Sequence, residues 1–107
     1  MEQPKVKVPT IFKVAGVSFH KKNVESLSED DILSLEREPD NKYDKNAIKI
    51  LNSQGNMIGF VPKEFNSVIC KKFEKITTKY VLKVKNIHKW DGPTGLEVEF
   101  SKVSQNC

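Results

Sequence analysis

Two adjacent residues, Tyr43 and Asp44, offer the clearest chemistry in this sequence. They lie in the polar segment 37–46, whose Pro, Asp and Asn residues are typical of turns. An exposed aromatic ring can stack on a nucleobase, and a carboxylate can accept hydrogen bonds from hydroxyl groups. The alternative is a structural turn in which Asp44 bonds to nearby backbone amides. The pair is therefore a candidate binding site that also has a simple structural explanation.

Lys63 is a second candidate, because it stands at the start of a predicted helix. Pro62 suits the beginning of a helix, where free backbone donors favour a phosphate group. A lysine at this end opposes the helix dipole, which makes contact with an anionic ligand more attractive. Such a contact adds affinity that depends on salt. The alternative is a solvated lysine.

No motif for catalysis or metal binding is found. His20 and His88 are far apart in the sequence and lack neighbours with metal-ligand spacing, and the acidic run 29–31 lacks the spacing of a calcium loop. Cys70 and Cys107 show no metal or redox spacing, so a structural disulfide is not expected and a reducing cytoplasm fits best. We therefore expect a protein that is not an enzyme and carries no cofactor.

The charges are unevenly distributed along the chain. The net charge is +4, with seven acids and one base in residues 25–40 but eight lysines and two acids in residues 63–89. A basic second half is compatible with a polyanion such as nucleic acid, and solvated surface lysines are the alternative. Arg37 is the only arginine among 18 basic residues, so sequence-specific reading of duplex DNA is not expected.

The elements that must position these residues fit one small β-rich domain. A chain of 107 residues with 37% hydrophobic residues can build one modest core. No apolar run reaches the roughly 18 residues of a membrane span, and residues 1–9 are expected to form a flexible polar arm without a secretory signal.

Strands are predicted over 11–19, 31–38, 47–51, 57–61, 80–90 and 96–100, with a helical turn over 23–27 and a helix over 63–75. This order predicts a small curled β-barrel or sandwich.

Apolar spacing predicts that one face of the helix joins the core. That face consists of Phe65, Val68, Ile69 and Phe73. Gly16, inside the first strand, indicates a bulge or a close approach of two backbones. Phe19, at the end of that strand, is either a core residue or an exposed aromatic.

The segment from Gly16 to Lys63 resembles the HIRAN domain family. Three motifs carry the resemblance: VAGVSF at 14–19, LEREPDNKYDKNAIKI at 35–50 and IGFVPK at 58–63. Their order and spacing match as well, which is more specific than any one motif. The resemblance implies a single domain over 10–104, mainly β, with a modified OB-like six-stranded β-barrel and one or two short helices.

The same resemblance implies the function. The best understood member of the family binds the 3′ end of single-stranded DNA, so we expect a DNA-binding module that recognises a free 3′-hydroxyl end. The resemblance also implies a link to DNA repair or replication-fork processing, with a helicase or nuclease as partner and no membrane. The chain is expected to be cytoplasmic if bacterial, or nuclear if it is part of a eukaryotic protein.

The pocket of the family can be carried over residue by residue. Tyr43 matches a tyrosine that lies against the terminal nucleotide, and Asp44 matches an acid that accepts a hydrogen bond from the free 3′-hydroxyl. Lys63 matches a lysine that contacts a backbone phosphate. Phe19 stands where a tyrosine is expected, and Ser18 stands where an arginine is expected, so one positive charge is missing.

Two further parts of the pocket are less well defined by the resemblance. Lys71 and the rest of the basic segment 63–89 are expected to guide the DNA backbone. The late aromatic of the family has three candidate counterparts, Trp90, Leu96 and Phe100. Because the arginine is missing, a protein-interaction module on the same barrel, with no DNA role, is the alternative function.

Overall fold

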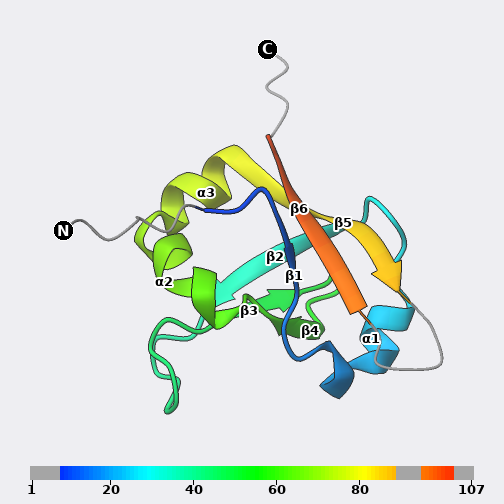
Figure 1. Cartoon of the computed structure of the whole chain (residues 1–107), viewed down its shortest axis with the longest axis horizontal. Helices are drawn as coiled ribbons and strands as arrows, with labels where there is room; N and C mark the ends of the chain where they lie inside the picture. Colours follow the sequence, from blue (N-terminus) through cyan, green and yellow to red (C-terminus); the bar gives the residue numbers. More distant parts are fainter. Residues whose placement is uncertain (1–7, 89–94, 103–107) are drawn as a thin grey trace.

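Six antiparallel strands form one curved sheet in this computed structural model, which describes residues 8–88 and 95–102 (Figure 1). The strands are β1 (Ile11–Lys13), β2 (Ile32–Arg37), β3 (Ile48–Leu51), β4 (Met57–Phe60), β5 (Tyr80–His88) and β6 (Gly95–Lys102). The helices are the 3-10 turn η1 (Val17–Phe19), α1 (Lys21–Glu25), α2 (Lys63–Lys71) and α3 (Phe73–Lys79). The strand order is β1-β6-β5-β2-β3-β4. The predicted arm 1–9 and turn 91–95 lie largely outside the described residues.

The sheet curls until its two edge strands meet at one residue pair. Ala15, just beyond β1, and Phe60 in β4 exchange two backbone hydrogen bonds of 2.8 Å. This isolated bridge joins the edges without a continuous ladder, so the sheet is not closed into a complete barrel. The expected mainly β, OB-like architecture with six strands is confirmed, and only the full closure of the barrel is not observed.

The first predicted strand, 11–19, is too long. Pairing with β6 ends at Lys13, and Gly16 has a φ of 74°, a left-handed conformation that favours glycine. The chain turns there into η1, so Ser18 and Phe19 lie on a tight helical turn instead of a strand. The other five predicted strands are present.

A second glycine allows the sheet edges to approach. A Cβ atom on Gly59 in β4 would collide with the carbonyl oxygen of Ala15 and with the side chain of Val14. Because β4 packs so closely against the chain that follows β1, only glycine fits at this position.

The predicted helix over 63–75 is two helices. The chain breaks at Lys72, with φ −113° and ψ 20°, and α3 then continues to Lys79, where β5 follows without a loop. The break changes the direction of the chain, so that α3 ends where β5 begins (Figure 1). Three α-helices are present in the described residues, against the one or two expected. The break contains neither Gly nor Pro, so the sequence has no local signal for it.

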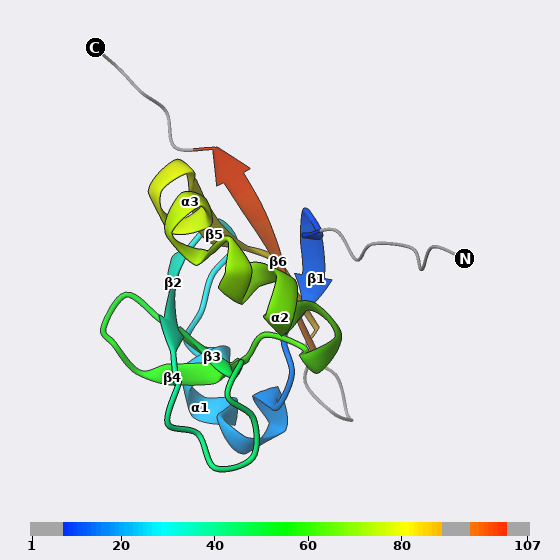
Figure 2. The same cartoon turned by 90° about the vertical axis from the view of Figure 1, so that its left-hand side faces the viewer.

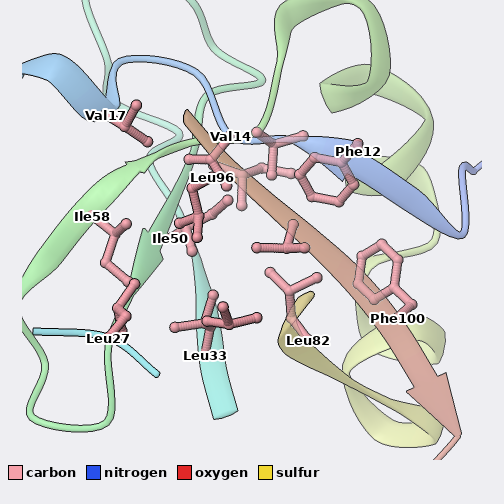
Figure 3. Close-up of a cluster of buried hydrophobic side chains, with 14 of the residues drawn as sticks. Phe12, Val14, Val17, Leu27, Leu33, Ile50, Ile58, Leu82, Leu96 and Phe100 are labelled. Carbon is pink, nitrogen blue, oxygen red and sulfur yellow. The ribbon is translucent and has the colours of Figure 1, made fainter. Parts of the chain in front are cut away.

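The core lies between the curled sheet and the helices (Figure 3). Alternate residues of β5 and β6 point into it, including Val84, Leu96 and Val98, which are almost fully buried. Each such side chain contributes about 1.5–3 kcal/mol of transfer free energy. The predicted apolar helix face is confirmed. Ile69 is fully buried, and the other three residues of that face pack against the core: Phe65, Val68 and Phe73. No helix in the described part of the chain is long and apolar enough to span a membrane.

Candidate functional site

The loop between β2 and β3 is shaped by the side chain of Asn41. Its Oδ1 accepts hydrogen bonds from the backbone N–H groups of Tyr43 and Asp44, at 2.8 and 3.0 Å. Its Nδ2 donates to Oε1 of Glu38 at 3.1 Å, which ties the turn to the end of β2. Asn41 therefore builds the turn that the polar segment predicted, and this turn fixes the backbone that carries Tyr43 and Asp44.

Asp44 is held by two hydrogen bonds, one on each carboxylate oxygen. The backbone N–H of Asn46 donates to Oδ1 at 2.9 Å, and Nδ2 of Asn66 in α2 donates to Oδ2 at 2.7 Å. These bonds, together with the nearby charge of Lys63, hold the pKa of the Asp44 carboxyl below its ordinary value. Asp44 is therefore an ionised acceptor at neutral pH.

The structural role of Asp44 leaves room for a ligand. A carboxylate offers about four lone-pair positions, and the two bonds to Asn46 and Asn66 use one on each oxygen. The side chain is half-buried, so solvent reaches it. The structural and ligand-binding explanations of the Tyr43–Asp44 pair are therefore compatible.

Asn66 is the residue of the candidate site that the sequence did not reveal. Its side chain is only 4% exposed, and a buried amide requires hydrogen-bond partners. A polar residue between Phe65 and Ile69 on a helix with an apolar face was the available signal. The partner could not be predicted, because Asp44 lies 22 residues away in the chain.

The two aromatic candidates are the most exposed large hydrophobic residues in the described part of the chain. The side chain of Tyr43 is 94% exposed and that of Phe19 is 85% exposed. The core alternative for Phe19 is therefore wrong, because the turn at Gly16 carries it out of the strand. Single exposed aromatic residues are common on protein surfaces, so this exposure makes both rings accessible to a ligand but does not by itself assign them a role.

Lys63 lies close enough to the Asp44 carboxylate for its charge to act on it, although the two groups form no ion pair within 4.0 Å. Its charge contributes to the lowered pKa of Asp44, and no side chain caps the first turn of α2. Lys71 is exposed at the other end of α2, about 12 Å away at 1.5 Å per residue. The structure therefore brings Lys63 into the site and leaves Lys71 outside direct contact with Asp44.

The segment from Phe60 to Asn66 connects the two flanks of the site. Phe60 is bonded to Ala15, from which the chain enters η1 and Phe19, whereas Asn66 is bonded to Asp44. In Figures 1 and 2, η1 and the β2–β3 loop both lie toward the lower end of the molecule, and Figure 1 shows them on different sides of that end. Phe19 thus forms a separate flank opposite the loop that carries Tyr43 and Asp44.

The remaining candidates fall into two groups. Ser18 is exposed beside Phe19 and adds no charge, although the exposed Lys21 and Lys22 follow directly in α1. Leu96 and Phe100 are buried in the core, so neither presents a stacking surface at this site, and Trp90 lies outside the described residues. Among the residues that the structure describes, no group of three or more His, Cys, Asp or Glu is placed to hold a metal ion.

Comparison with protein families identifies this arrangement. The family model of the HIRAN domain matches residues 9–102. The chain is 42% identical over 43 residues to the helicase-like transcription factor of Oryctolagus cuniculus, an alignment that covers 40% of this chain and 4% of that protein. It is 45% identical over 38 residues to the helicase-like transcription factor of Homo sapiens, covering 36% of this chain and 4% of that protein. The chain therefore spans a small fraction of these relatives.

Solved structures with the same fold are also found. The crystal structure of the HIRAN domain of human HLTF has a TM-score of 0.63 and 24% identity, covering 84% of this chain and 72% of that chain. The crystal structure of a protein from Lactobacillus plantarum has a TM-score of 0.65 and 21% identity, covering 86% of this chain and 89% of that chain. The NMR structure of the HLTF HIRAN domain in its DNA-bound conformation has a TM-score of 0.59 and 21% identity, covering 85% of this chain and 70% of that chain. At these identities, the likeness establishes the fold.

Proposed function

Because this chain belongs to the HIRAN domain family, we propose that it is a module that binds single-stranded DNA at a free 3′-hydroxyl end. The observation that carries the proposal is the pairing of an almost fully exposed Tyr43 with an ionised Asp44 held from two sides. The existence of a DNA-bound conformation of the HLTF domain, which shares this fold, supports it.

Each residue of the site has a distinct physical role in this proposal. Tyr43 stacks on the terminal base, and such stacking contributes about 1–3 kcal/mol without selecting a base. Asp44 accepts a hydrogen bond from the 3′-hydroxyl group. A 3′-phosphate would instead place negative charge against the carboxylate, so the site favours a free hydroxyl. Lys63 contacts a backbone phosphate, and Phe19 packs on the strand from the opposite flank.

The proposal extends to the process in which the module acts. The relatives named as helicase-like transcription factors are much longer than this chain. We propose that the module presents a DNA end during DNA repair or replication-fork processing, with a helicase or nuclease as its partner. In this role the module itself carries out no catalysis.

The test is a binding titration with short oligonucleotides that end in a 3′-hydroxyl or a 3′-phosphate. We expect the hydroxyl end to bind about tenfold more tightly, which corresponds to about 1.4 kcal/mol. Asp44→Asn should remove this difference, whereas Asp40→Asn, an exposed acid of the same loop, should retain it. Equal affinity of the wild-type protein for both ends would exclude the role of Asp44. No binding of any DNA at low salt would exclude DNA binding.

An interaction with another protein is the second candidate, and the exposure of Phe19 favours it. An aromatic residue that is 85% exposed can serve as the anchor of a protein interface. The neighbouring Ser18 lacks the positive charge that a DNA contact would use. Phe19→Ala distinguishes the two functions. A weaker affinity for DNA supports the DNA role of this flank, and an unchanged affinity favours the protein interface.

A further inference from the structure

A cavity lies away from the Tyr43 loop, between α3 and the chain that leads into β1. Its volume is about 320 Å³. Its lining consists of Val8, Pro9, Thr10, Lys72, Lys75, Ile76, Lys79, Tyr80 and Phe100. Three of these side chains are lysines and none is acidic. The family motifs between Gly16 and Lys63 contribute nothing to this cavity.

The lysines form a concentrated positive rim. Lys75 and Lys79 are four residues apart, which places them on one face of α3, and Lys72 lies at the break just before that helix. All three are exposed. Three like charges around one cavity repel one another, and an anion bound between them would relieve that repulsion. The rim therefore selects a ligand with more than one negative charge.

The floor of the cavity is apolar and contains one accessible aromatic ring. Phe100 and Ile76 are buried, whereas Tyr80 is half-buried and packs edge-on against Phe100 at 6.4 Å. A positive groove with an aromatic platform is the combination that binds single-stranded nucleic acids without sequence preference. A smaller cavity of about 190 Å³ on α3 shares this floor but has no charged residue in its lining. The charge thus distinguishes the first cavity as a site for a polyanion.

The two sites lie along one face of the molecule. Figure 2 shows the β2–β3 loop, α2 and α3 one above the other. Lys63 stands at the start of α2, where its charge acts on Asp44, Lys71 stands at the end of α2, and the cavity follows along α3. A strand held by its 3′ end at Asp44 therefore has a path of positive charge toward the cavity. This continuity favours nucleic acid over an acidic peptide.

We propose that this cavity is a second subsite for single-stranded DNA, which holds nucleotides upstream of the 3′ end. This inference rests on the proposed function, because the 3′ end sets the register of the strand. From Lys63 to Lys79 the helices extend at most about 24 Å at 1.5 Å per residue. A strand stacked as in duplex DNA advances about 3.4 Å per nucleotide, so roughly seven nucleotides reach the cavity. Shorter strands occupy only the end site.

The test compares oligonucleotides of four and twelve nucleotides that carry the same 3′-hydroxyl end. We expect Lys75→Gln/Lys79→Gln to weaken binding of the twelve-nucleotide strand by about tenfold and to leave the four-nucleotide strand unchanged. The slope of log affinity against log salt should become shallower by about 1.4 for the longer strand, since each phosphate contact of a single strand contributes about 0.7. The matched control is Lys13→Gln/Lys85→Gln, which removes two exposed lysines outside the cavity and should change neither strand's affinity appreciably.

Each other outcome is decisive. Equal weakening of the longer strand by the cavity variant and the control would show general charge attraction and overturn the subsite. Equal weakening of both strand lengths would overturn its separation from the end site. Competition by a glutamate-rich peptide as effective as competition by DNA would assign the cavity to acidic peptides instead. If binding does not distinguish 3′-hydroxyl from 3′-phosphate ends, but the lysine-dependent length effect persists, the end recognition fails and the subsite stands.

Discussion

At the scale of single residues, Asp44 has a structural role in the loop, and in the proposed function it also accepts a hydrogen bond from the ligand. Its oxygens accept hydrogen bonds from Asn46 and Asn66, and these bonds stabilise the ionised form that a ligand hydroxyl requires. The same bonds fix the direction of the carboxylate, because Asn66 is buried in α2. The loop and the helix therefore prepare the acceptor before any ligand arrives.

Removing the helix contact tests this arrangement. Asn66→Ala should weaken the preference for a 3′-hydroxyl end several-fold, because the carboxylate loses its orientation. The pKa of Asp44 should also rise toward its ordinary value, since one stabilising hydrogen bond is lost. The measurements are affinity for the two end types and an NMR titration of the Asp44 carboxyl. Ser67→Ala, at an exposed neighbouring position of α2, is the control. An unchanged end preference in Asn66→Ala would contradict the positioning role.

The lowered pKa of Asp44 also predicts how stability depends on pH. A carboxyl whose pKa is lower in the folded state stabilises the fold above its unfolded value of about 3.9. This contribution is lost as pH falls below that value and through the pKa of the folded state. The difference in free energy of unfolding between wild type and Asp44→Ala should therefore shrink on acidification below about pH 4. Urea unfolding at pH 7, 4 and 3 measures it, and a difference independent of pH would contradict the assignment.

At the scale of elements, the site depends on how the two sheet edges meet. The Ala15–Phe60 bridge holds the chain that enters η1 against β4, and β4 leads within a few residues to Lys63. Gly16 then turns Phe19 outward. A single contact between edges therefore sets the position of Phe19 relative to the start of α2.

A substitution at Gly59 tests this dependence. Gly59→Ala places a methyl group against the Ala15 carbonyl, so the bridge must open or shift. We expect a loss of about 1–3 kcal/mol in the free energy of unfolding, as for other overpacked sites. DNA affinity should fall because Phe19 moves. Gly55→Ala is the control: it has open space but a φ of 82°, so it should cost about 1–2 kcal/mol without changing DNA affinity. Wild-type stability in Gly59→Ala would contradict the close approach.

At the scale of the whole molecule, charge is separated between two regions of the fold. The seven acids of residues 25–40 lie in the segment from α1 through β2 to the following loop, whereas four lysines lie on α2 and α3 and a fifth, Lys72, lies at the break between them. A surface with one sign of charge attracts a polyanion to that side and orients it. In the proposed function, the helices therefore provide the electrostatic face and the β2–β3 loop provides the end-specific contact.

Salt dependence tests this division. For a twelve-nucleotide strand, contacts with roughly four phosphates predict a log–log slope of about −3, at about −0.7 per contact. For a four-nucleotide strand, which reaches fewer lysines, the slope should be about −1. The measurement is a series of fluorescence anisotropy titrations between low and moderate salt. Equal slopes for both lengths would show that the α2–α3 face takes no part in binding.

The sequence by itself determined the strands and the local chemistry of the turn. The residue pattern predicted β2 to β6. Successive side chains of a strand point to opposite faces of the sheet, so this pattern can be recognised from residues that are adjacent in the chain. The residue types of Asn41, Tyr43 and Asp44 indicated a polar turn and a candidate site, because their hydrogen bonds join near neighbours. Resemblance to the HIRAN family supplied their expected roles. All of these features depend on contacts between residues close in the chain.

Only the tertiary structure decided which distant groups meet. The partner of Asp44 is Asn66, which lies 22 residues away in the chain. Phe19 is exposed because the chain turns before it, and the residue pattern of 11–19 did not distinguish this turn from a continuing strand. The break at Lys72 and the cavity beside Tyr80 have no sequence signal of their own. The reason is physical. The curvature of the sheet determines where its edges and covering helices lie, and that curvature results from packing of the whole core at once.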